Sequence, residues 1–419
     1  MRRLTFAAAV GLAAASAASM AMAAETETIT ISDEIGIVKV NKGQPILIGG
    51  YWVISGPDTA LGLDSKRGAE VYFAERDNTI AGHPIRFIVE DDQCNAEGGQ
   101  NAATKLAANQ NIVGVIGPAC SSAATPAAPI LWKAGIVDIG TATTAPRLTA
   151  PDRGPDYDGY ARTIYSDNLQ GAGDAEWMYN VAGFRKAATI HDGSPYAEQL
   201  AKVFEAEFKK RGGEVVSSEA VSPTDVDMRP VLTRIASSKP DVVYFPIFVA
   251  SAGHLVRQMK DIDGFDKITP IGGGALFAKD FIAAGGESVV GFKITFPDVS
   301  DEAMGETYPQ LVATYKEMFG EAPIQGFHAH AYDAARILSQ AIEKVAVTDD
   351  SGNTYIGRKA LRDAVFSTAP FNGVSGPIEC DAHGQCGKFT FAVYEFTSAD
   401  PESFEPGVNP KKVYSTADN

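Results

Sequence analysis

Short apolar runs alternate with helix-length segments along the chain from Pro45 onward. The first series of apolar runs is PILIGGYWV, IRFIVEDD, VGVIGP and VDIG, with helical patterns through residues 64–76, 102–108 and 121–133. Strands that are apolar throughout and alternate with helices are typical of a parallel sheet that helices cover on both faces. The pattern therefore predicts a doubly wound α/β fold.

A second series of the same kind follows residue 160. Its apolar runs are AATIHD, EVVSSEAV, DVVYFPIF, ITPIGG and VGFKITFP, again separated by helical patterns. The segment Thr149–Tyr160, TAPDRGPDYDGY, is rich in Pro, Gly and Asp, so it predicts a crossing between two lobes. Two consecutive series predict two α/β lobes.

The last quarter of the chain continues with helical patterns around residues 308–318, 331–345 and 358–365. The runs FNGVSGPIECD and KFTFAVYEF come next and predict an antiparallel hairpin. The tail, residues 398–419, has little periodicity, and we expect it to be loosely ordered.

The first 24 residues have the pattern of a secretory signal peptide. Arg2 and Arg3 precede an Ala-rich apolar run from Leu4 to Met22, and small residues lie just before Glu25. An uncleaved membrane anchor is the alternative, because the run approaches the roughly 20 residues that span a bilayer. Its weak hydrophobicity favours cleavage, so we expect an exported chain.

The charge of the chain disfavours two classes of partner. Lys and Arg number 36 and Asp and Glu 52, and removal of Arg2 and Arg3 with the leader changes the net charge from −16 to −18. An acidic surface disfavours nucleic acid and anionic membranes. About 395 residues remain after the leader, which suits two or three domains.

Cys94, Cys120, Cys380 and Cys386 are the four cysteines of the chain. In an exported protein an even number predicts disulfides, with three connectivities open. The segment ECDAHGQC also contains His383, which opens a metal site as an alternative. Zinc spacing and further ligands are lacking, so a local disulfide is the favoured interpretation and we expect no metal.

Polar residues follow two of the predicted strands. Ser121 and Ser122 come where the run VGVIGP meets a helix, so hydroxyls and helix N–H groups can hold a carboxylate there. Helix capping is the alternative role. Ala142, Thr143 and Thr144 end the next strand and offer acceptors for a ligand ammonium or hydroxyl, unless they form an ordinary Ser/Thr loop.

Motifs of common enzyme classes are lacking from the sequence. It contains no G-x-S-x-G elbow, no Walker A loop, no H-E-x-x-H and no G-x-G-x-x-G after a strand. His328 and His330, two residues apart, are poorly spaced for a shared metal on a helix. We therefore expect no enzyme of these classes and no cofactor.

The motifs, taken in order, resemble the branched-chain amino-acid type of periplasmic solute-binding proteins of ABC transporters. The resemblance rests on ISGPDTALGLDSKRGAEVYFAERDN, GHPIRFIVEDDQC, IGPACSS, TATTAPRLT, IHDGSPYAEQLA, KPDVVYF and YDAARIL, between about Pro45 and Phe396. It implies the type I periplasmic binding protein fold, in which two Rossmann-like doubly wound lobes are joined by a hinge of three crossovers. The expected limits are 1–24 for the signal peptide, 45–160 plus about 291–368 for lobe 1, 161–290 plus about 369–397 for lobe 2, and 398–419 for the tail.

The resemblance also implies roles for single residues. Ser121 matches the residue that holds the ligand carboxylate, and the loop from Ala142 to Thr144 matches one that supplies a carbonyl and a hydroxyl. Tyr196, in HDGSPY, matches a tyrosine that closes over the ligand. Phe248 and Phe277, near second-lobe strand ends, are expected to add apolar contacts, with core packing as the alternative for at least one of them.

The sequence departs from the family pattern at Leu61, which replaces an aromatic residue that often lies near the ligand, and at Gly274. Amino-acid binders of the family have an acidic residue there, which pairs with the α-ammonium of the ligand, whereas this chain reads PIGGGALF. A buried, unpaired ammonium costs several kcal/mol. Aromatic or aliphatic carboxylates and amides are therefore alternatives to a neutral amino acid.

The resemblance further implies a disulfide between Cys94 and Cys120, a periplasmic location, a monomer, and an inner-membrane ABC permease as partner. A sensory receptor of the same fold is the alternative, because one fold serves both uses.

Overall fold

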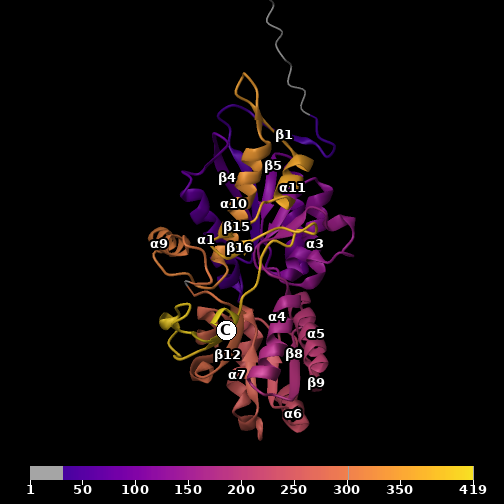
Figure 1. The fold of residues 1–419 in the computed structure, drawn as a ribbon, viewed down its shortest axis with the longest axis vertical. Helices are drawn as coiled ribbons and strands as arrows, with labels where there is room; N and C mark the ends of the chain where they lie inside the picture. The colour runs from indigo at the N-terminus through magenta and orange to yellow at the C-terminus, as the bar shows by residue number, and fades with distance from the viewer. Residues whose placement is uncertain (1–31, 301, 419) are drawn as a thin grey trace, which may run out of the picture. The chain divides into compact units, whose positions relative to one another are not determined.

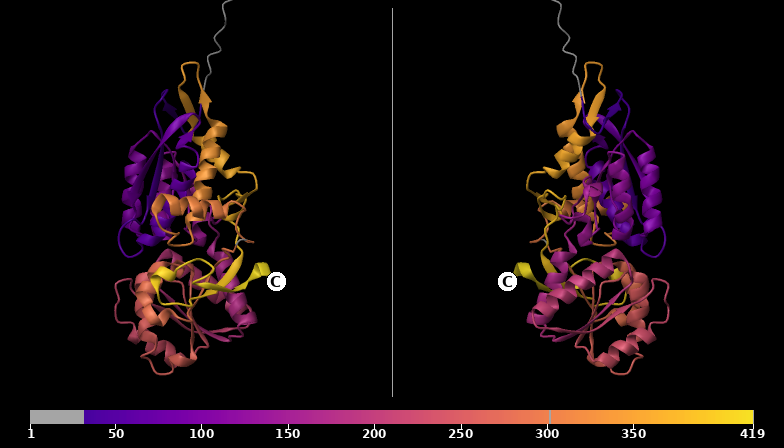
Figure 2. Two further views of the ribbon diagram at one scale, coloured as in Figure 1. Left: turned by 90° about the vertical axis from the view of Figure 1, so that its left-hand side faces the viewer. Right: turned by 90° about the vertical axis from the view of Figure 1, so that its right-hand side faces the viewer.

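A computed structural model describes residues 32–300 and 302–418, so the expected signal peptide lies outside the described residues. Residues 32–419 form one compact unit. Its strands make two large sheets, which lie in the upper and lower halves of this unit in Figures 1 and 2. We call these halves the first and the second lobe. They confirm the two predicted α/β lobes.

The first sheet has six strands and is mainly parallel. In hydrogen-bonded order they are β3 (Thr79–Ile80), β4 (His83–Asp91), β2 (Ile46–Trp52), β5 (Ile112–Ile116), β6 (Val137–Gly140) and β7 (Tyr160–Arg162). The helices of this lobe are α1 (Thr59–Ala74), α2 (Ala96–Ala108), α3 (Ser121–Lys133), α9 (Tyr308–Phe319), α10 (His328–Val345) and α11 (Arg358–Phe366).

Helices cover both faces of the first sheet, as its continuously apolar strands predict. On one face Val115 of β5 packs in a buried cluster with Leu106 of α2 and Leu131 of α3. On the other face, a Cβ added to Gly114 would lie 2.7 Å from the side chain of Leu338 on α10. The glycine therefore lets α10 approach the sheet closely.

The second sheet has seven strands. In hydrogen-bonded order they are β18 (Lys411–Ser415), β17 (Phe391–Glu395), β12 (Lys293–Pro297), β11 (Thr269–Gly272), β10 (Val242–Phe245), β8 (Lys186–His191) and β9 (Glu214–Ala220). The helices of this lobe are α4 (Asp167–Glu176), α5 (Pro195–Lys210), α6 (Arg229–Ser238), α7 (Val249–Met259) and α8 (Lys279–Gly285).

Two segments differ from the sequence-based expectations about this sheet. Residues from about 291 were assigned to the first lobe, but β12 is hydrogen-bonded between β11 and β17. Apolar periodicity predicts a buried strand without saying which sheet it joins. The tail was expected to be loose, but β18 pairs with β17, and the Tyr414 ring lies 6.3 Å from that of Phe391.

The predicted hairpin between residues 371–381 and 388–396 is wrong. Instead β15 (Phe371–Gly373) pairs with β16 (Gly376–Ile378) around a tight turn, which the positive φ of Gly376 allows. The Asp333 carboxylate on α10 accepts the N–H groups of Val374 and Ser375, so this hairpin belongs beside the first lobe. The partner of β17 is β12.

A small third sheet joins the beginning of the described chain to the first lobe. It consists of β1 (Ile37–Val40), β14 (Thr354–Gly357) and β13 (Val347–Thr348). Three segments then connect the large sheets: the one between β7 and α4, the one between β12 and α9, and the one between β16 and β17. This is the three-crossover hinge that the resemblance implies. The first crossing follows β7, so the prediction of a crossing at Thr149–Tyr160 is wrong: that segment lies before β7, which pairs with β6 in the first sheet.

The structure pairs Cys94 with Cys120, and Cys380 with Cys386. The first bond ties the loop after β4 to the residue before α3, across a sequence separation of 26 residues. The second closes a loop with a separation of 6 residues in the third crossing.

We expect the double variant Cys94→Ser, Cys120→Ser to lose about 3 kcal/mol of unfolding free energy, because the bond restricts a long loop of the unfolded chain. Urea denaturation measures the loss. The variant Cys380→Ser, Cys386→Ser is the matched control, with an expected loss of about 2 kcal/mol because its loop is shorter. An unchanged urea midpoint for the first variant would contradict this expectation.

Candidate functional site

The carboxyl ends of the parallel strands in the two sheets lie around the same place, between the two lobes. In the first sheet, β2 has β4 on one side and β5 on the other, so the strand order reverses there. In the second sheet the order reverses at β8, between β9 and β10. Ligands of open α/β sheets bind at such switch points, beyond the carboxyl ends of the strands.

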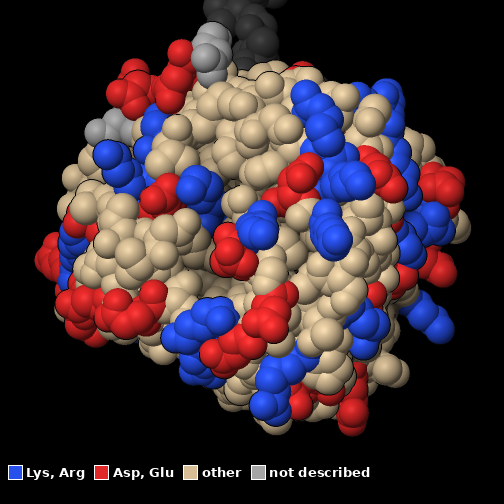
Figure 3. All heavy atoms as spheres, turned by 90° about the horizontal axis from the view of Figure 1, so that it is seen from below, with Lys and Arg blue, Asp and Glu red and all other residues tan. Residues whose placement is uncertain are grey.

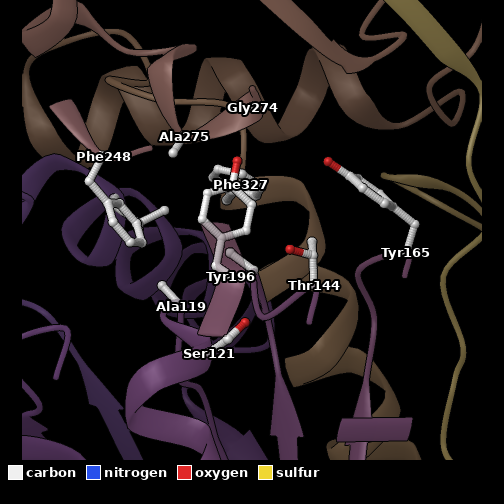
Figure 4. Close-up of a pocket in the computed structure, with 11 residues that line it drawn as sticks. Ala119, Ser121, Thr144, Tyr165, Tyr196, Phe248, Gly274, Ala275 and Phe327 are labelled. Carbon is white, nitrogen blue, oxygen red and sulfur yellow. The ribbon is translucent and has the colours of Figure 1, made fainter. Parts of the chain in front are cut away.

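A cavity of about 20 Å³ lies at this place between the two lobes. Figure 4 shows the side chains around it. The residues that line it are Leu61, Ala119, Ser121, Ala142, Thr144, Tyr165, Tyr196, Phe248, Gly274, Ala275 and Phe327. Since about 10–15 Å³ is needed to hold one water molecule, an organic ligand enters only when lobes or side chains move apart.

Ser121 is the first residue of α3, and it is 2 % exposed. Its Oγ accepts a hydrogen bond of 3.2 Å from the N–H of Ala145, so its own proton remains to be donated. N–H groups in the first turn of a helix lack intrahelical partners and carry a partial positive charge. The start of α3 thus offers donors to an anion.

Thr144 extends its hydroxyl toward the same space as Ser121, as Figure 4 shows. Its Oγ1 is buried and has no hydrogen-bond partner among the described residues. The backbone of this loop is fixed on both sides of Thr144, because Arg162 Nη1 donates to the carbonyls of Thr143, at 2.7 Å, and Ala145, at 2.9 Å.

Tyr196 closes the cavity from the second lobe. It lies in the first turn of α5, which begins at Pro195 after the cap residue Ser194, whose Oγ accepts the N–H of Ala197. The Tyr196 ring lies 5.4 Å from that of Phe248, and its buried Oη has no partner among the described residues. Burial raises the pKa of Tyr196, so the phenol stays neutral and its O–H can donate a hydrogen bond to a ligand.

Gly274 forms part of the wall where the family pattern has an acidic residue. A Cβ added there would lie 2.9 Å from the Phe296 ring and 3.5 Å from Tyr165 Oη. Phe296 is held in place by stacking on Phe277, with ring centroids 4.4 Å apart. Aromatic rings thus fill the space that a side chain at position 274 would need.

The wall of the cavity is uncharged, since none of its described lining residues has an ionisable side chain other than tyrosine. Asp167, the first residue of α4, follows the first crossing, and its N–H donates to the Thr144 carbonyl at 2.9 Å. Burial raises the pKa of Asp167 to about 8, while the nearby Thr144 hydroxyl and the charge of Arg162 lower it, although neither group forms a hydrogen bond with it in the structure. Neither carboxyl oxygen has a partner within hydrogen-bonding distance among the described residues.

A second cavity, of about 600 Å³, adjoins the first at Phe248. Ser122 lines this outer cavity, and its hydroxyl is donated to the Cys94 carbonyl at 2.6 Å. Asp58 of the first lobe faces Asp192 of the second across it. Burial raises the pKa of Asp58 to about 6, and the nearby charges of Asp192 and Asp280 add to the shift.

The structure brings together seven of the residues that the sequence singles out. They are Leu61, Ser121, Ala142, Thr144, Tyr196, Phe248 and Gly274, and all line the inner cavity. Ser122 lies in the outer cavity instead. Thr143 points away, because its hydroxyl is bonded to Tyr160. Phe277 is fully buried in its stack with Phe296, which is the core-packing alternative.

Four lining residues were missed by sequence reasoning: Ala119, Tyr165, Ala275 and Phe327. Ala119 and Ala275 carry no chemical signal, since alanines are common throughout the chain. Tyr165 lies in the first crossing and Phe327 just before α10. Residues on connecting segments could be predicted to line the cavity only once the positions of the crossings were known.

The described residues include no group of three or more His, Cys, Asp or Glu side chains that could hold a metal ion. The described part of the chain also has no helix long and apolar enough to cross a bilayer. Figure 3 shows the second lobe from below, with acidic and basic side chains interspersed. This face does not have the basic patch that is typical of nucleic-acid binding.

Comparison with known proteins gives a consistent result. A family model described as periplasmic binding protein matches residues 45–400. The chain is 30% identical over 309 residues to the Leu/Ile/Val-binding protein BraC3 of Rhizobium johnstonii, covering 73% of this chain and 81% of the relative. It is 28% identical over 353 residues to the Leu/Ile/Val-binding protein homolog 3 of Brucella melitensis biotype 1, covering 84% and 91%.

Solved structures share the fold. A leucine binding protein LivK from Thermotoga maritima superposes with a TM-score of 0.74 at 23% identity, covering 84% of this chain and 96% of the other. A solute binding protein of an ABC transporter from R. palustris, in complex with benzoate, gives a TM-score of 0.72 at 24% identity, covering 88% and 96%.

Proposed function

Since the chain belongs to the periplasmic binding protein family, as a non-enzymatic solute-binding protein of ABC transporters, we propose that its solute is a small carboxylate with an uncharged body. The observation that carries this proposal is the composition of the inner cavity. Its wall combines hydroxyl groups at the start of α3 and on the neighbouring loop with apolar and aromatic side chains, and it has no charged group.

The carboxylate end of the solute is assigned to Ser121. The Ser121 hydroxyl has its proton available because its Oγ already accepts the Ala145 N–H. A hydrogen bond to a charged group is roughly twice as strong as one between neutral groups. The first N–H groups of α3 add to it, as at other helix N termini that bind anions.

The uncharged body of the solute is assigned to the aromatic side of the cavity. Phe248, Tyr196 and Phe327 form this side together with Leu61. A zwitterion would bring an ammonium to Gly274, where Phe296 lies too close for even a Cβ to fit without a shift. The relative that binds benzoate supports an aromatic carboxylate.

A neutral amino acid of the branched-chain class is the second candidate. One observation favours it: Asp167 has a buried carboxyl group without a hydrogen-bond partner among the described residues, next to Thr144. An ammonium close to Thr144 would lower the pKa of this group and ionise it. The relatives called Leu/Ile/Val-binding support this candidate.

A thermal-shift screen of the exported chain separates the two candidates, because a ligand of the native state raises the melting temperature. We expect benzoate or a short aliphatic carboxylate to raise it by several degrees at about 100 times its Kd. L-leucine and L-isoleucine are expected to have little effect. Stabilisation by these amino acids alone would contradict the first candidate and support the second.

In the proposed transport role, binding of the solute is coupled to closure of the two lobes. The solute docks on Ser121 of the first lobe, and Tyr196 of the second lobe then covers it. The closed form presents both lobes to an inner-membrane permease. Export through an N-terminal signal peptide to the periplasm, and action as a monomer, belong to the same proposal. Two disulfides among the described residues agree with an oxidising compartment.

A further inference from the structure

Strand β7, which leads into the first crossing, lies directly on the third crossing. Arg162, the last residue of β7, donates its N–H to the Gly384 carbonyl at 2.8 Å, and its own carbonyl accepts the N–H of Cys386 at 3.0 Å. A Cβ added to Gly384 would lie 2.5 Å from the Tyr160 carbonyl oxygen. The end of β7 and the third crossing therefore touch through their backbones, at the start of the hinge.

Arg162 is a buried cation without a carboxylate partner among the described ion pairs. It is 0 % exposed, and burial lowers its pKa to about 10. Its Nη1 holds the carbonyls of Thr143 and Ala145, and its Nη2 donates to Thr149 Oγ1 at 2.7 Å. The carbonyls on both sides of Thr144 are thus bound by one guanidinium.

Gln385 holds that guanidinium from the third crossing. Its Oε1 accepts Arg162 Nε at 2.6 Å, and its Nε2 donates to the carbonyls of Ile164, at 2.8 Å, and Gly387, at 3.1 Å. One amide therefore fixes the guanidinium and also ties the backbone of the first crossing to that of the third. Only an amide side chain makes both kinds of contact at once, because its oxygen accepts from Arg162 while its nitrogen donates to the two carbonyls.

The loop that presents Gln385 is itself tightly closed. The Cys380–Cys386 bond joins its ends, and the Asp381 N–H donates to the Gln385 carbonyl at 3.0 Å. Asp381 Oδ1 accepts the N–H groups of His383 and Gln385 in return. These contacts leave the loop little freedom, so the amide of Gln385 has a fixed position.

We propose that Gln385, presented by the disulfide-closed loop 380–386, is a positioning residue for ligand binding. It acts through Arg162, which holds the loop that carries Thr144 into the cavity. Gln385 lies outside the inner cavity, so it does not touch the solute. Its effect on affinity rests on the proposed function, whereas its effect on the Thr144 loop does not.

The test uses the exported chain and measures hydrogen–deuterium exchange at two amides without added solute. They are the N–H of Asp167, which donates to the Thr144 carbonyl, and the N–H of Ala145, which donates to Ser121 Oγ. We expect Gln385→Met to speed exchange at both by at least about tenfold, because fixation of the loop is lost. Unchanged exchange at both amides overturns the proposal, whichever solute the protein binds.

Gln385→Glu is the conservative variant. Its carboxylate still accepts from Arg162 but cannot donate to Ile164 and Gly387. Because a carboxylate oxygen then lies against these two carbonyl oxygens, we expect exchange between that of the natural chain and that of Gln385→Met, which marks the bond to Arg162 as one that positions the loop. Equal acceleration in the Met and Glu variants overturns the assigned role of Arg162.

A destabilised control separates positioning from general loss of stability. Thr189→Val removes a buried hydroxyl of β8, in the second lobe, which donates to Glu205 Oε1 at 2.6 Å. Its Asp167 and Ala145 amides are expected to exchange as in the natural chain, and the same acceleration as in Gln385→Met overturns the proposal. Affinity for benzoate and L-leucine is then titrated as a second measurement. If the loop amides respond but neither probe binds, the proposed solute class fails while the positioning role stands.

Discussion

We expect Ser121→Ala to weaken binding of the preferred carboxylate by roughly 10- to 100-fold, which is the loss expected when one hydrogen bond to a charged group is removed. The Ser121 Oγ already accepts the Ala145 N–H, so its proton is the one available to the solute. Isothermal titration calorimetry measures the change. A modest loss of stability accompanies it, because the Ala145 N–H loses its acceptor.

Ser122→Ala is the matched control for this substitution. The two serines are adjacent on α3, but the Ser122 hydroxyl is donated to the Cys94 carbonyl and lines the outer cavity. We expect its affinity to be unchanged. If the two variants bind equally well, the carboxylate does not dock on Ser121; if Ser122→Ala is the weaker binder, the solute lies in the outer cavity.

The layers of the fold could be predicted from the sequence, because the pattern of apolar residues indicates which strands are buried on both sides. The strand β5, IVGVI, is buried at every position, as a strand covered by helices on both sides must be. The same logic failed to assign β12 to the correct lobe. Its apolar run, KITFP, satisfies the burial requirement of either sheet, and only the pairing with β11 and β17 decides.

The site could be predicted in part, for a related reason. Ser121 and Thr144 come shortly after parallel strands, and ligands bind beyond the carboxyl ends of such strands, so their place in the sequence already indicates that they lie near the cavity. The contact between Arg162 and Gln385 joins residues 223 positions apart. No local pattern signals such a contact, since it depends on how β7 and the third crossing pack.

Gly274 was recognised from the resemblance as a departure, but the sequence could not say what fills the space. In the structure Phe296 fills this space. Its ring stacks on that of Phe277, with centroids 4.4 Å apart, and lies edge-on to that of Phe327, with centroids 5.2 Å apart. The acidic residue of the family pattern is therefore replaced by aromatic packing rather than by an empty space.

The largest effect is expected for Gly274→Glu. The new side chain must displace the Phe296 ring, which lies 2.9 Å from the position of its Cβ. Such overpacking typically costs about 1–3 kcal/mol, and a buried, unpaired carboxylate adds to the cost. Because this carboxylate also repels a carboxylate solute in the same cavity, we expect affinity to fall by more than about 100-fold.

Gly274→Gln separates the two causes, because glutamine has nearly the same size without the charge. We expect Gln to reproduce the loss of stability, measured by urea denaturation, and only part of the loss of affinity. The remaining difference between Glu and Gln is then the charge repulsion, and it should shrink at acidic pH as the new carboxyl group is protonated. Equal affinity of the Glu variant and the natural chain would mean that the solute does not reach Gly274, and the specificity assigned to this position would be wrong.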